Sequence, residues 1–173
     1  MIERIFTIGA YGFNEDTFVE TLKRAGADLF IDIRARRGMR GSLYAFANAA
    51  RLQALLQSAG IRYVHAKDLA PTEHVRDAQR TVDAASGTLK RERTVLGDAF
   101  KAAYERECLS DFDPVAFART SAADCKRPVL FCVEREPEAC HRSLVAPRLS
   151  KALAVPVENL RPAAIVHTLA TRA

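Results

Sequence analysis

The stretch DLFIDIR, residues 28–34, decides the fold, because it has the composition of a strand that is buried on both faces. Its apolar residues are nearly continuous, as in a central strand of a parallel sheet that helices cover on both sides. The carboxylate of Asp32 interrupts this run, and burying a carboxylate costs free energy unless it is paired. We therefore expect a parallel strand here, with an arginine as the partner of Asp32.

Strands and helices alternate on either side of this stretch. Residues 5–9, IFTIG, predict a strand, and residues 14–25 predict a helix with Asn14 as its cap and Gly26 at its end. A second helix is expected over residues 47–59 and a third strand over 61–66, where the sequence is IRYVHA. This alternation indicates an α/β fold with a parallel sheet.

The second half of the chain continues the pattern less regularly. Residues 127–133, RPVLFCV, predict a buried strand, and the last strand or two fall within residues 157–169. Helices are expected over three further segments: 94–108, 113–122 and 141–154. Residues 68–91 are polar and predict a mobile lid or a helical insertion.

These elements predict one α/β domain spanning residues 1–173. At this length a chain buries a core without disulfides or a metal. The expected architecture is a three-layer sandwich: a mostly parallel, Rossmann-like sheet of about five strands with helices on both faces.

Composition narrows the class of protein. No apolar run reaches the roughly 18 residues that a membrane helix needs, and the N-terminus lacks the pattern of a signal peptide, so we expect a cytoplasmic protein without membrane contact. The four cysteines show no CxxC pair and are expected to be free thiols. Cys132, Cys140 and His141 are candidate zinc ligands, but zinc sites usually show more closely spaced ligand pairs, so we expect neither a metal nor a cofactor. The net charge of +5, mostly from arginine, suits recognition of phosphate or carboxylate.

Polar residues follow several of the predicted strands. In a parallel α/β sheet, ligands bind beyond the carboxyl ends of the strands. The residues expected at that edge are Tyr11 after the first strand, Asp32 and Arg34 on the second, Tyr63 and His65 on the third, and Cys132 and Glu134 on the fourth.

The loop after residue 34 is the most basic part of the chain. Its arginines, including Arg34 and Arg40, alternate with glycines that allow close approach of a ligand to the backbone. We expect Arg34, Arg40 and Arg142 to neutralise an anionic ligand, with Asp32 and Glu134 positioning the arginines. Tyr63 or Tyr11 would stack on a base. The alternative is a solvated, flexible turn.

The stretch CVEREPEACHR, residues 132–142, leads from a buried strand through a turn to a helix N-terminus. Free N–H groups at such an end favour an anion or a thiolate. Cys140 is thus a candidate nucleophile, with His141 or His65 as its base and Glu134 as an orienting group. Alternatively, Arg142 and the helix end bind phosphate while Cys140 only packs. Adjacent helical residues diverge by about 100°, which weakens a simple dyad of Cys140 and His141.

Taken together, three blocks of the chain resemble domain-of-unknown-function family 488 (DUF488). They begin at residues 7, 60 and 129 and read TIGAYGFNEDTFVETLKRAGADLFIDIRARRGMRGSLYAF, GIRYVHAKDLAP and VLFCVEREPEACHRSLVAPRL. The resemblance spans roughly residues 4 to 167 and implies a single bacterial-type α/β domain without a settled activity. Many members carry a histidine where this chain has Ala10.

The function expected from these residues is binding of a phosphate-bearing ligand, either a nucleotide or nucleic acid, at an arginine-rich pocket at the strand carboxyl ends. A hydrolase or transferase that uses Cys140 is one alternative. A non-enzymatic interaction module, which docks a partner through residues 68–91, is the other. The oligomeric state stays open.

Overall fold

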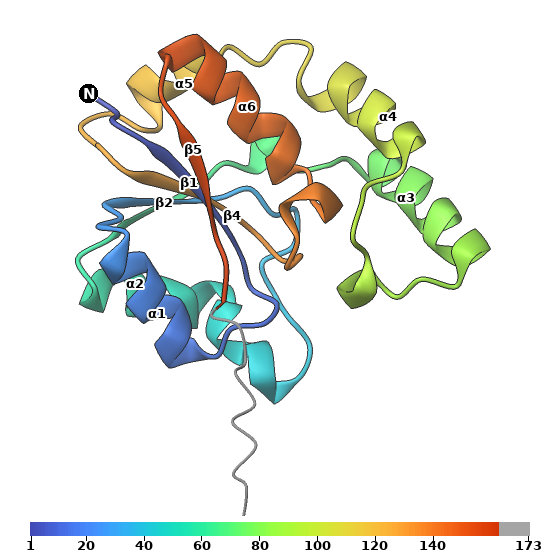
Figure 1. Cartoon of the computed structure of the whole chain (residues 1–173), viewed down its shortest axis with the longest axis horizontal. Coiled ribbons are helices and arrows are strands. Elements are labelled where there is room, and N and C mark those ends of the chain that lie inside the picture. Colours follow the sequence, from blue (N-terminus) through green and yellow to red (C-terminus); the bar gives the residue numbers. More distant parts are fainter. Residues whose placement is uncertain (163–173) are drawn as a thin grey trace, which may run out of the picture.

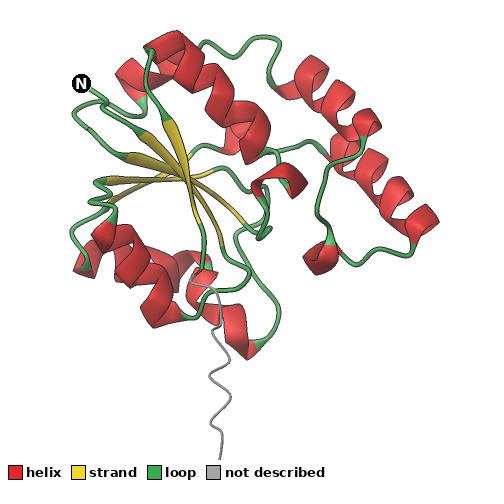
Figure 2. Cartoon of the chain, viewed as in Figure 1, coloured by secondary structure: helices red, strands yellow, loops and turns green. Residues whose placement is uncertain are grey.

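A five-stranded, fully parallel sheet forms the centre of the protein (Figures 1 and 2). The computed structural model describes residues 1–162, apart from the side chain of Arg91. The strand order is β3-β2-β4-β1-β5, and the strands are β1 (Ile5–Gly9), β2 (Leu29–Asp32), β3 (Arg62–His65), β4 (Pro128–Cys132) and β5 (Val157–Leu160). The predicted parallel α/β sheet is confirmed. The part of the last predicted strand segment beyond residue 162 lies outside the described residues.

Two helices cover one face of the sheet, α1 (Glu15–Arg24) and α2 (Ala49–Ser58) (Figure 1). The Asn14 side chain caps α1, accepting a hydrogen bond of 2.8 Å from the backbone N–H of Thr17. Phe18 of this helix lies fully buried against the rings of Phe30 and Phe131 on the sheet. These aromatic contacts hold α1 against the sheet.

The opposite face carries α5 (Pro114–Thr120) and α6 (Arg142–Leu153) (Figure 1). Val145 and Leu149 of α6 are buried in the hydrophobic core on this face, which also contains Ile31 and Leu130 of the sheet. Helices therefore pack on both faces, which confirms the predicted three-layer sandwich.

The remaining two helices, α3 (Glu73–Ser86) and α4 (Asp98–Cys108), form a pair beside the sheet (Figure 1). The Tyr104 hydroxyl of α4 donates a 2.6 Å hydrogen bond to the Leu69 carbonyl, and the Gln79 side chain accepts one of 2.9 Å from the N–H of Gly97. The polar segment 68–91 is thus mainly the helix α3. Its mobility stays a prediction.

Short 3₁₀ turns complete the chain at Ser42–Ala47, Lys67–Leu69, Lys90–Glu92 and Pro137–Ala139. Within residues 1–162, no helix has the length and apolar character needed to cross a membrane. All strands run in the same direction, so their carboxyl ends lie at the same edge of the sheet. The last residues of β1, β2, β3 and β4 at this edge are Gly9, Asp32, His65 and Cys132. The candidate site lies at that edge.

Candidate functional site

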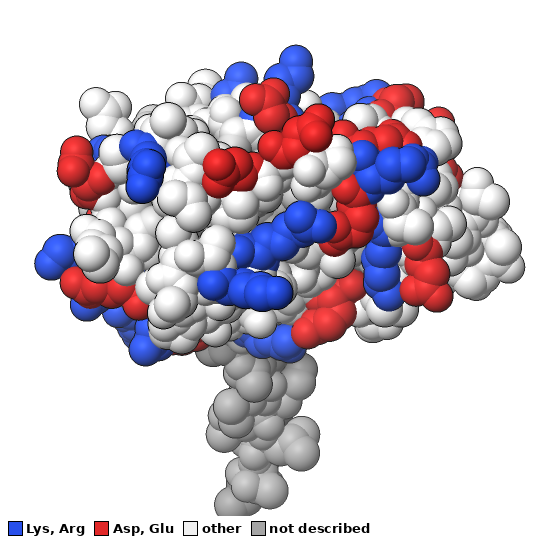
Figure 3. Space-filling view, turned by 90° about the horizontal axis from the view of Figure 1, so that it is seen from above, with Lys and Arg blue, Asp and Glu red and all other residues white. Residues whose placement is uncertain are grey.

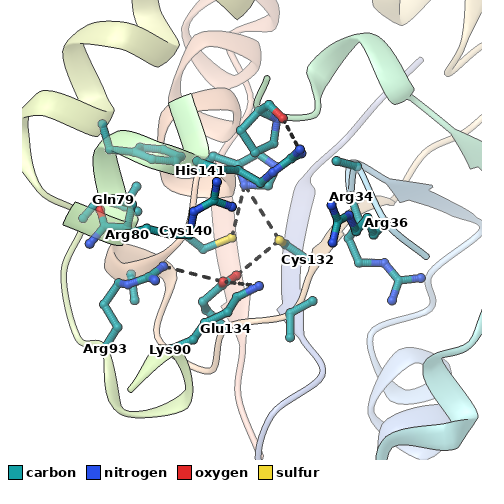
Figure 4. A pocket seen from close by; sticks show the side chains of 17 residues that line it. Arg34, Arg36, Gln79, Arg80, Lys90, Arg93, Cys132, Glu134, Cys140 and His141 are labelled. Atoms are coloured by element: carbon teal, nitrogen blue, oxygen red, sulfur yellow. Dashed lines mark hydrogen bonds and ion pairs between the residues drawn. The ribbon is translucent and has the colours of Figure 1, made fainter. Parts of the chain in front are cut away.

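A cavity of about 280 Å³ opens at the carboxyl ends of β2 and β4. Figure 4 shows that its side chains come from two directions, with Arg34 and Arg36 on one side of a cysteine cluster and Arg80, Lys90 and Arg93 on the other. Six cationic side chains line the cavity, which are Arg34, Arg36, Arg76, Arg80, Lys90 and Arg93. Glu134 is the one carboxylate among the lining residues. The cavity therefore has a positive lining.

Arg34 is held by a buried ion pair with Asp32. Its Nε and Nη2 atoms each lie 2.8 Å from one carboxylate oxygen, in the two-pronged geometry that guanidinium and carboxylate groups favour. Both side chains are almost fully buried, at 2% and 0% exposure, and the guanidinium lies 4.5 Å from the centre of the Phe131 ring. The third nitrogen, Nη1, is buried and has no hydrogen-bond partner among the described residues.

Tyr63 and His65 support this pair from β3 and do not line the cavity. The Tyr63 hydroxyl donates a 2.9 Å hydrogen bond to Oδ2 of Asp32, and burial raises the pKa of this phenol. His65 Nε2 lies 2.9 Å from the carbonyl oxygen of Arg34, which can only accept, so Nε2 carries the proton. These contacts position Arg34 instead of providing a stacking surface or a base in the cavity.

Two other expected ligand-binding residues lie outside the cavity lining. Tyr11 packs edge-on against Tyr44, with 5.0 Å between ring centres. Arg40 is exposed in the loop that precedes the 3₁₀ turn at Ser42–Ala47. Arg36 of the same loop is the residue that lines the cavity instead.

Two cysteines and a histidine form a buried cluster in the cavity wall (Figure 4). Nδ1 of His141 lies 3.8 Å from Sγ of Cys132 and 3.8 Å from Sγ of Cys140. Cys140 has an extended backbone with φ −140° and ψ 143°, and α6 begins only at Arg142. The expected divergence of neighbouring helical residues therefore does not apply, and Cys140 and His141 face the same point.

Glu134 joins this cluster to the cationic wall. Its Oε2 accepts from the Cys132 thiol at 3.3 Å, while Oε1 lies 3.4 Å from Lys90 Nζ and 3.8 Å from Arg93 Nη1. Burial acts to raise the pKa of Glu134, but the charges of Lys90 and His141 together with hydrogen bonds from a backbone N–H and from Cys132 outweigh it and lower this pKa to about 2. The carboxylate is therefore charged although it is buried.

The pKa values of the two thiols in the cluster are shifted in opposite directions. Burial would raise the pKa of Cys140, but its interaction with the neighbouring Cys132 and the positive charges of His141 and Arg142 lower it to about 5. Burial and the neighbouring Cys140 raise the pKa of Cys132. The interaction with Cys140 raises the pKa of His141, against the effect of its burial. The environment thus favours one negative sulfur at this position.

Arg142 does not face the cavity, in contrast to the expectation of a phosphate at this helix end. The side chain is fully buried, and Nη1 and Nη2 donate to the carbonyl oxygens of Glu134 and Arg135 at 2.6 and 2.9 Å. Behind this turn, a Cβ atom on Gly9 would lie 1.8 Å from the carbonyl oxygen of Glu134. Arg142 therefore holds the turn that carries Glu134.

The helix α3 and the turn at Lys90–Glu92 supply lining residues that the sequence interpretation did not select. Arg76, Gln79 and Arg80 recur at the spacing of one helical face, and this is the signal by which they could have been found. Lys90 and Arg93 carried no local signal, because their approach to Glu134 joins segments more than forty residues apart. Docking of a partner on residues 68–91 stays a prediction.

Comparison with known proteins gives a family without an activity. The sequence profile of the family described as "Domain of unknown function DUF488" matches residues 14–149. Neither a curated protein nor a solved structure matches the chain. The profile covers most of the chain, including β2, β4 and the cysteine cluster, and the chain therefore belongs to the DUF488 family.

Proposed function

We propose that the protein binds a small anionic molecule, with phosphate as the favoured group, in the cavity at the ends of β2 and β4. One observation carries this proposal: Arg34 lines the cavity, and its Nη1 atom is buried and has no hydrogen-bond partner among the described residues. A buried charged donor without a partner costs free energy, and an oxygen of an anionic ligand would satisfy it.

The charge of the cavity supports an anion. Most lining cations are already paired with carboxylates, as Arg80 is with Glu73 and Arg93 with Asp83. Arg36 forms no ion pair within residues 1–162, and Arg34 keeps one free donor after binding Asp32. Two guanidinium groups on the same side of the cavity are therefore available to a ligand. Their planar donor sets match phosphate oxygens.

The size of the cavity favours a small molecule over nucleic acid. Its volume of about 280 Å³ lies near the lower end for ligand pockets. Nucleic acid is usually bound along a continuous basic surface. On the face in Figure 3, Lys and Arg alternate with Asp and Glu. A mononucleotide or sugar phosphate is thus the preferred class.

Binding is tested by thermal unfolding and calorimetric titration with phosphate, mononucleotides, sugar phosphates and short single-stranded RNA and DNA. We expect at least one small phosphate compound to stabilise the wild-type chain. Arg36→Ala should weaken that binding about tenfold, because one charge-assisted hydrogen bond is lost. Arg40→Ala, in the same loop but outside the cavity lining, is the matched control and should bind normally.

Two outcomes would refute the proposal. One is that none of these compounds stabilises the protein. The other is that Arg36→Ala and Arg40→Ala weaken binding equally, which would indicate a general effect of charge. Stabilisation by RNA or DNA alone would identify nucleic acid as the ligand and overturn the assignment to a small molecule.

A further inference from the structure

The cysteine cluster has a geometry of its own that anion binding does not explain. Sγ of Cys132, Sγ of Cys140 and Nδ1 of His141 all lie within 4.8 Å of one another, and all three residues are buried. The sulfur–nitrogen distances of 3.8 Å are long for hydrogen bonds. In a tetrahedral zinc site, sulfur and nitrogen ligands lie about 3.6 Å apart and two sulfurs about 3.8 Å apart. Shifts of less than an ångström per donor would reach that geometry.

His141 has the orientation of a metal ligand. Its Nε2 lies 2.9 Å from the carbonyl oxygen of Ile33, so this nitrogen carries a proton and donates it. In the neutral ring the lone pair is then on Nδ1, the atom between the two sulfurs. A hydrogen bond from the other ring nitrogen to a backbone carbonyl is the usual support of a metal-binding histidine.

The surrounding charges balance a divalent ion. Two thiolates and a neutral imidazole neutralise Zn²⁺, and the remaining negative charge of Glu134 is compensated by Lys90 and Arg93. Two thiolates with one imidazole select zinc over magnesium or calcium, which prefer oxygen ligands.

We propose that Cys132, Cys140 and His141 bind one zinc ion, with the fourth coordination position directed to the cavity. All three ligands belong to the cavity wall, so water or an oxygen of a bound molecule has access to that position. Three protein ligands with one open position are typical of catalytic zinc sites. Glu134, whose carboxylate lies 3.3 Å from Sγ of Cys132, borders the same space. The proposal does not depend on binding of an anion.

The first test measures zinc in the full-length protein, purified without chelator, by elemental analysis. We expect about one zinc per chain in the wild type, and no more than about a tenth of that content in Cys132→Ser and Cys140→Ser, because each removes one ligand. Cys108→Ser and Cys125→Ser are the controls, because both cysteines are free thiols outside the cluster. They should retain the zinc.

A second measurement uses only the wild-type chain, so it stays informative if a cysteine variant fails to fold. Titration of the metal-free protein with Co²⁺ should produce thiolate-to-cobalt charge-transfer absorption in the near ultraviolet and the visible bands of tetrahedral cobalt. Zinc added afterwards should remove both. Zinc should also slow alkylation of Cys140, since a coordinated thiolate reacts less readily than a free one.

The proposal is overturned if the purified protein lacks stoichiometric zinc and Co²⁺ produces neither absorption. Zinc that stays bound in the Cys132→Ser and Cys140→Ser variants would equally exclude this site. If Cys140 alkylates rapidly at a rate that zinc does not change, the cluster holds a free nucleophile. The anion-binding test, which compares the wild type with Arg36→Ala, is carried out on protein from which a chelator has removed metal. Failure of either proposal therefore leaves the other standing.

Discussion

The cavity joins two strand ends that use their polar groups differently. At the end of β2, Asp32 and Arg34 are fixed by hydrogen bonds of normal length, three of them to Asp32 from the Arg34 side chain and the Tyr63 hydroxyl. After β4, the two cysteines face His141 at 3.8 Å, without a short bond among the three. The first region pairs its buried charges internally except for one donor, Nη1 of Arg34, and the second keeps three donor atoms that an external atom can bring together. Polar groups that are paired with each other hold the cavity wall in place, while polar groups that lack a close partner indicate where a ligand or an ion binds.

The largest effect is expected from breaking the β2 pair. Asp32→Ala leaves the Arg34 guanidinium buried without its carboxylate, since both side chains are almost inaccessible. We expect a loss of about 3–5 kcal/mol in the free energy of unfolding. Denaturant unfolding at neutral pH measures this loss. A loss below about 1 kcal/mol would mean that the ion pair of Asp32 and Arg34 does not hold this part of the site in place.

A smaller effect is expected from crowding the turn that carries Glu134. In Gly9→Ala, the added Cβ would meet the carbonyl of Glu134 at 1.8 Å, so the turn has to move. We expect a loss of about 2–3 kcal/mol in stability, together with weaker zinc binding. Gly38→Ala is the matched control, because nothing among the described residues lies within 4 Å of its added Cβ. Equal effects of the two substitutions would contradict this account.

The pair of Arg93 and Asp83 gives a prediction that depends on pH. Burial acts to raise the pKa of Asp83, but hydrogen bonds from Arg93 and Gln79 outweigh it and lower the pKa below its ordinary 3.8. A carboxyl whose pKa is lower in the folded state stabilises the protein above the unfolded pKa. This contribution is lost as the pH falls through the folded pKa.

Asp83→Asn should therefore cost about 1–2 kcal/mol at neutral pH, and the difference from wild type should shrink below about pH 4. Unfolding curves of both proteins across this range measure the effect. A difference that stays constant between pH 7 and pH 3 would show that the charge of Asp83 is not involved.

The smallest expected effect concerns the hydroxyl of Tyr63. Tyr63→Phe removes one hydrogen bond to Asp32 but leaves both bonds from Arg34 in place. We expect a loss of about 1 kcal/mol in the free energy of unfolding. If the loss approaches that of Asp32→Ala, the tyrosine and not the arginine is the main partner of this carboxylate.

The fold could be predicted from local patterns, because each element carries its own signal. DLFIDIR and RPVLFCV are apolar enough to indicate buried strands, and Asn14 and Asp113 cap the helices that follow them. The rule that ligands bind at the carboxyl ends of parallel strands placed the site at the correct edge of the sheet for Arg34 and Glu134, which line the cavity.

The orientation of individual side chains could not be predicted in the same way. Arg142 and Cys140 are two residues apart, yet one points behind the turn and the other into the cavity wall. That choice depends on whether a residue precedes the first helical turn, and the boundary of a helix is the least certain part of such a prediction. The spacing of Cys132, Cys140 and His141 permits a shared metal but does not predict that their side chains converge, because this depends on how the turn at Pro137–Ala139 folds back.

The strand order has a consequence for synthesis of the protein. β1 and β2 do not pair with each other, since β4 lies between them in the sheet. A nascent chain that ends before Pro128 therefore lacks the strand that joins its two halves, and the inner edges of β1 and β2 stay open. Unpaired edges of this kind promote aggregation. A ribosome that stalls before Pro128 should thus release fragments that are prone to aggregate, and the cavity forms only after the strand that carries Cys132 has been inserted.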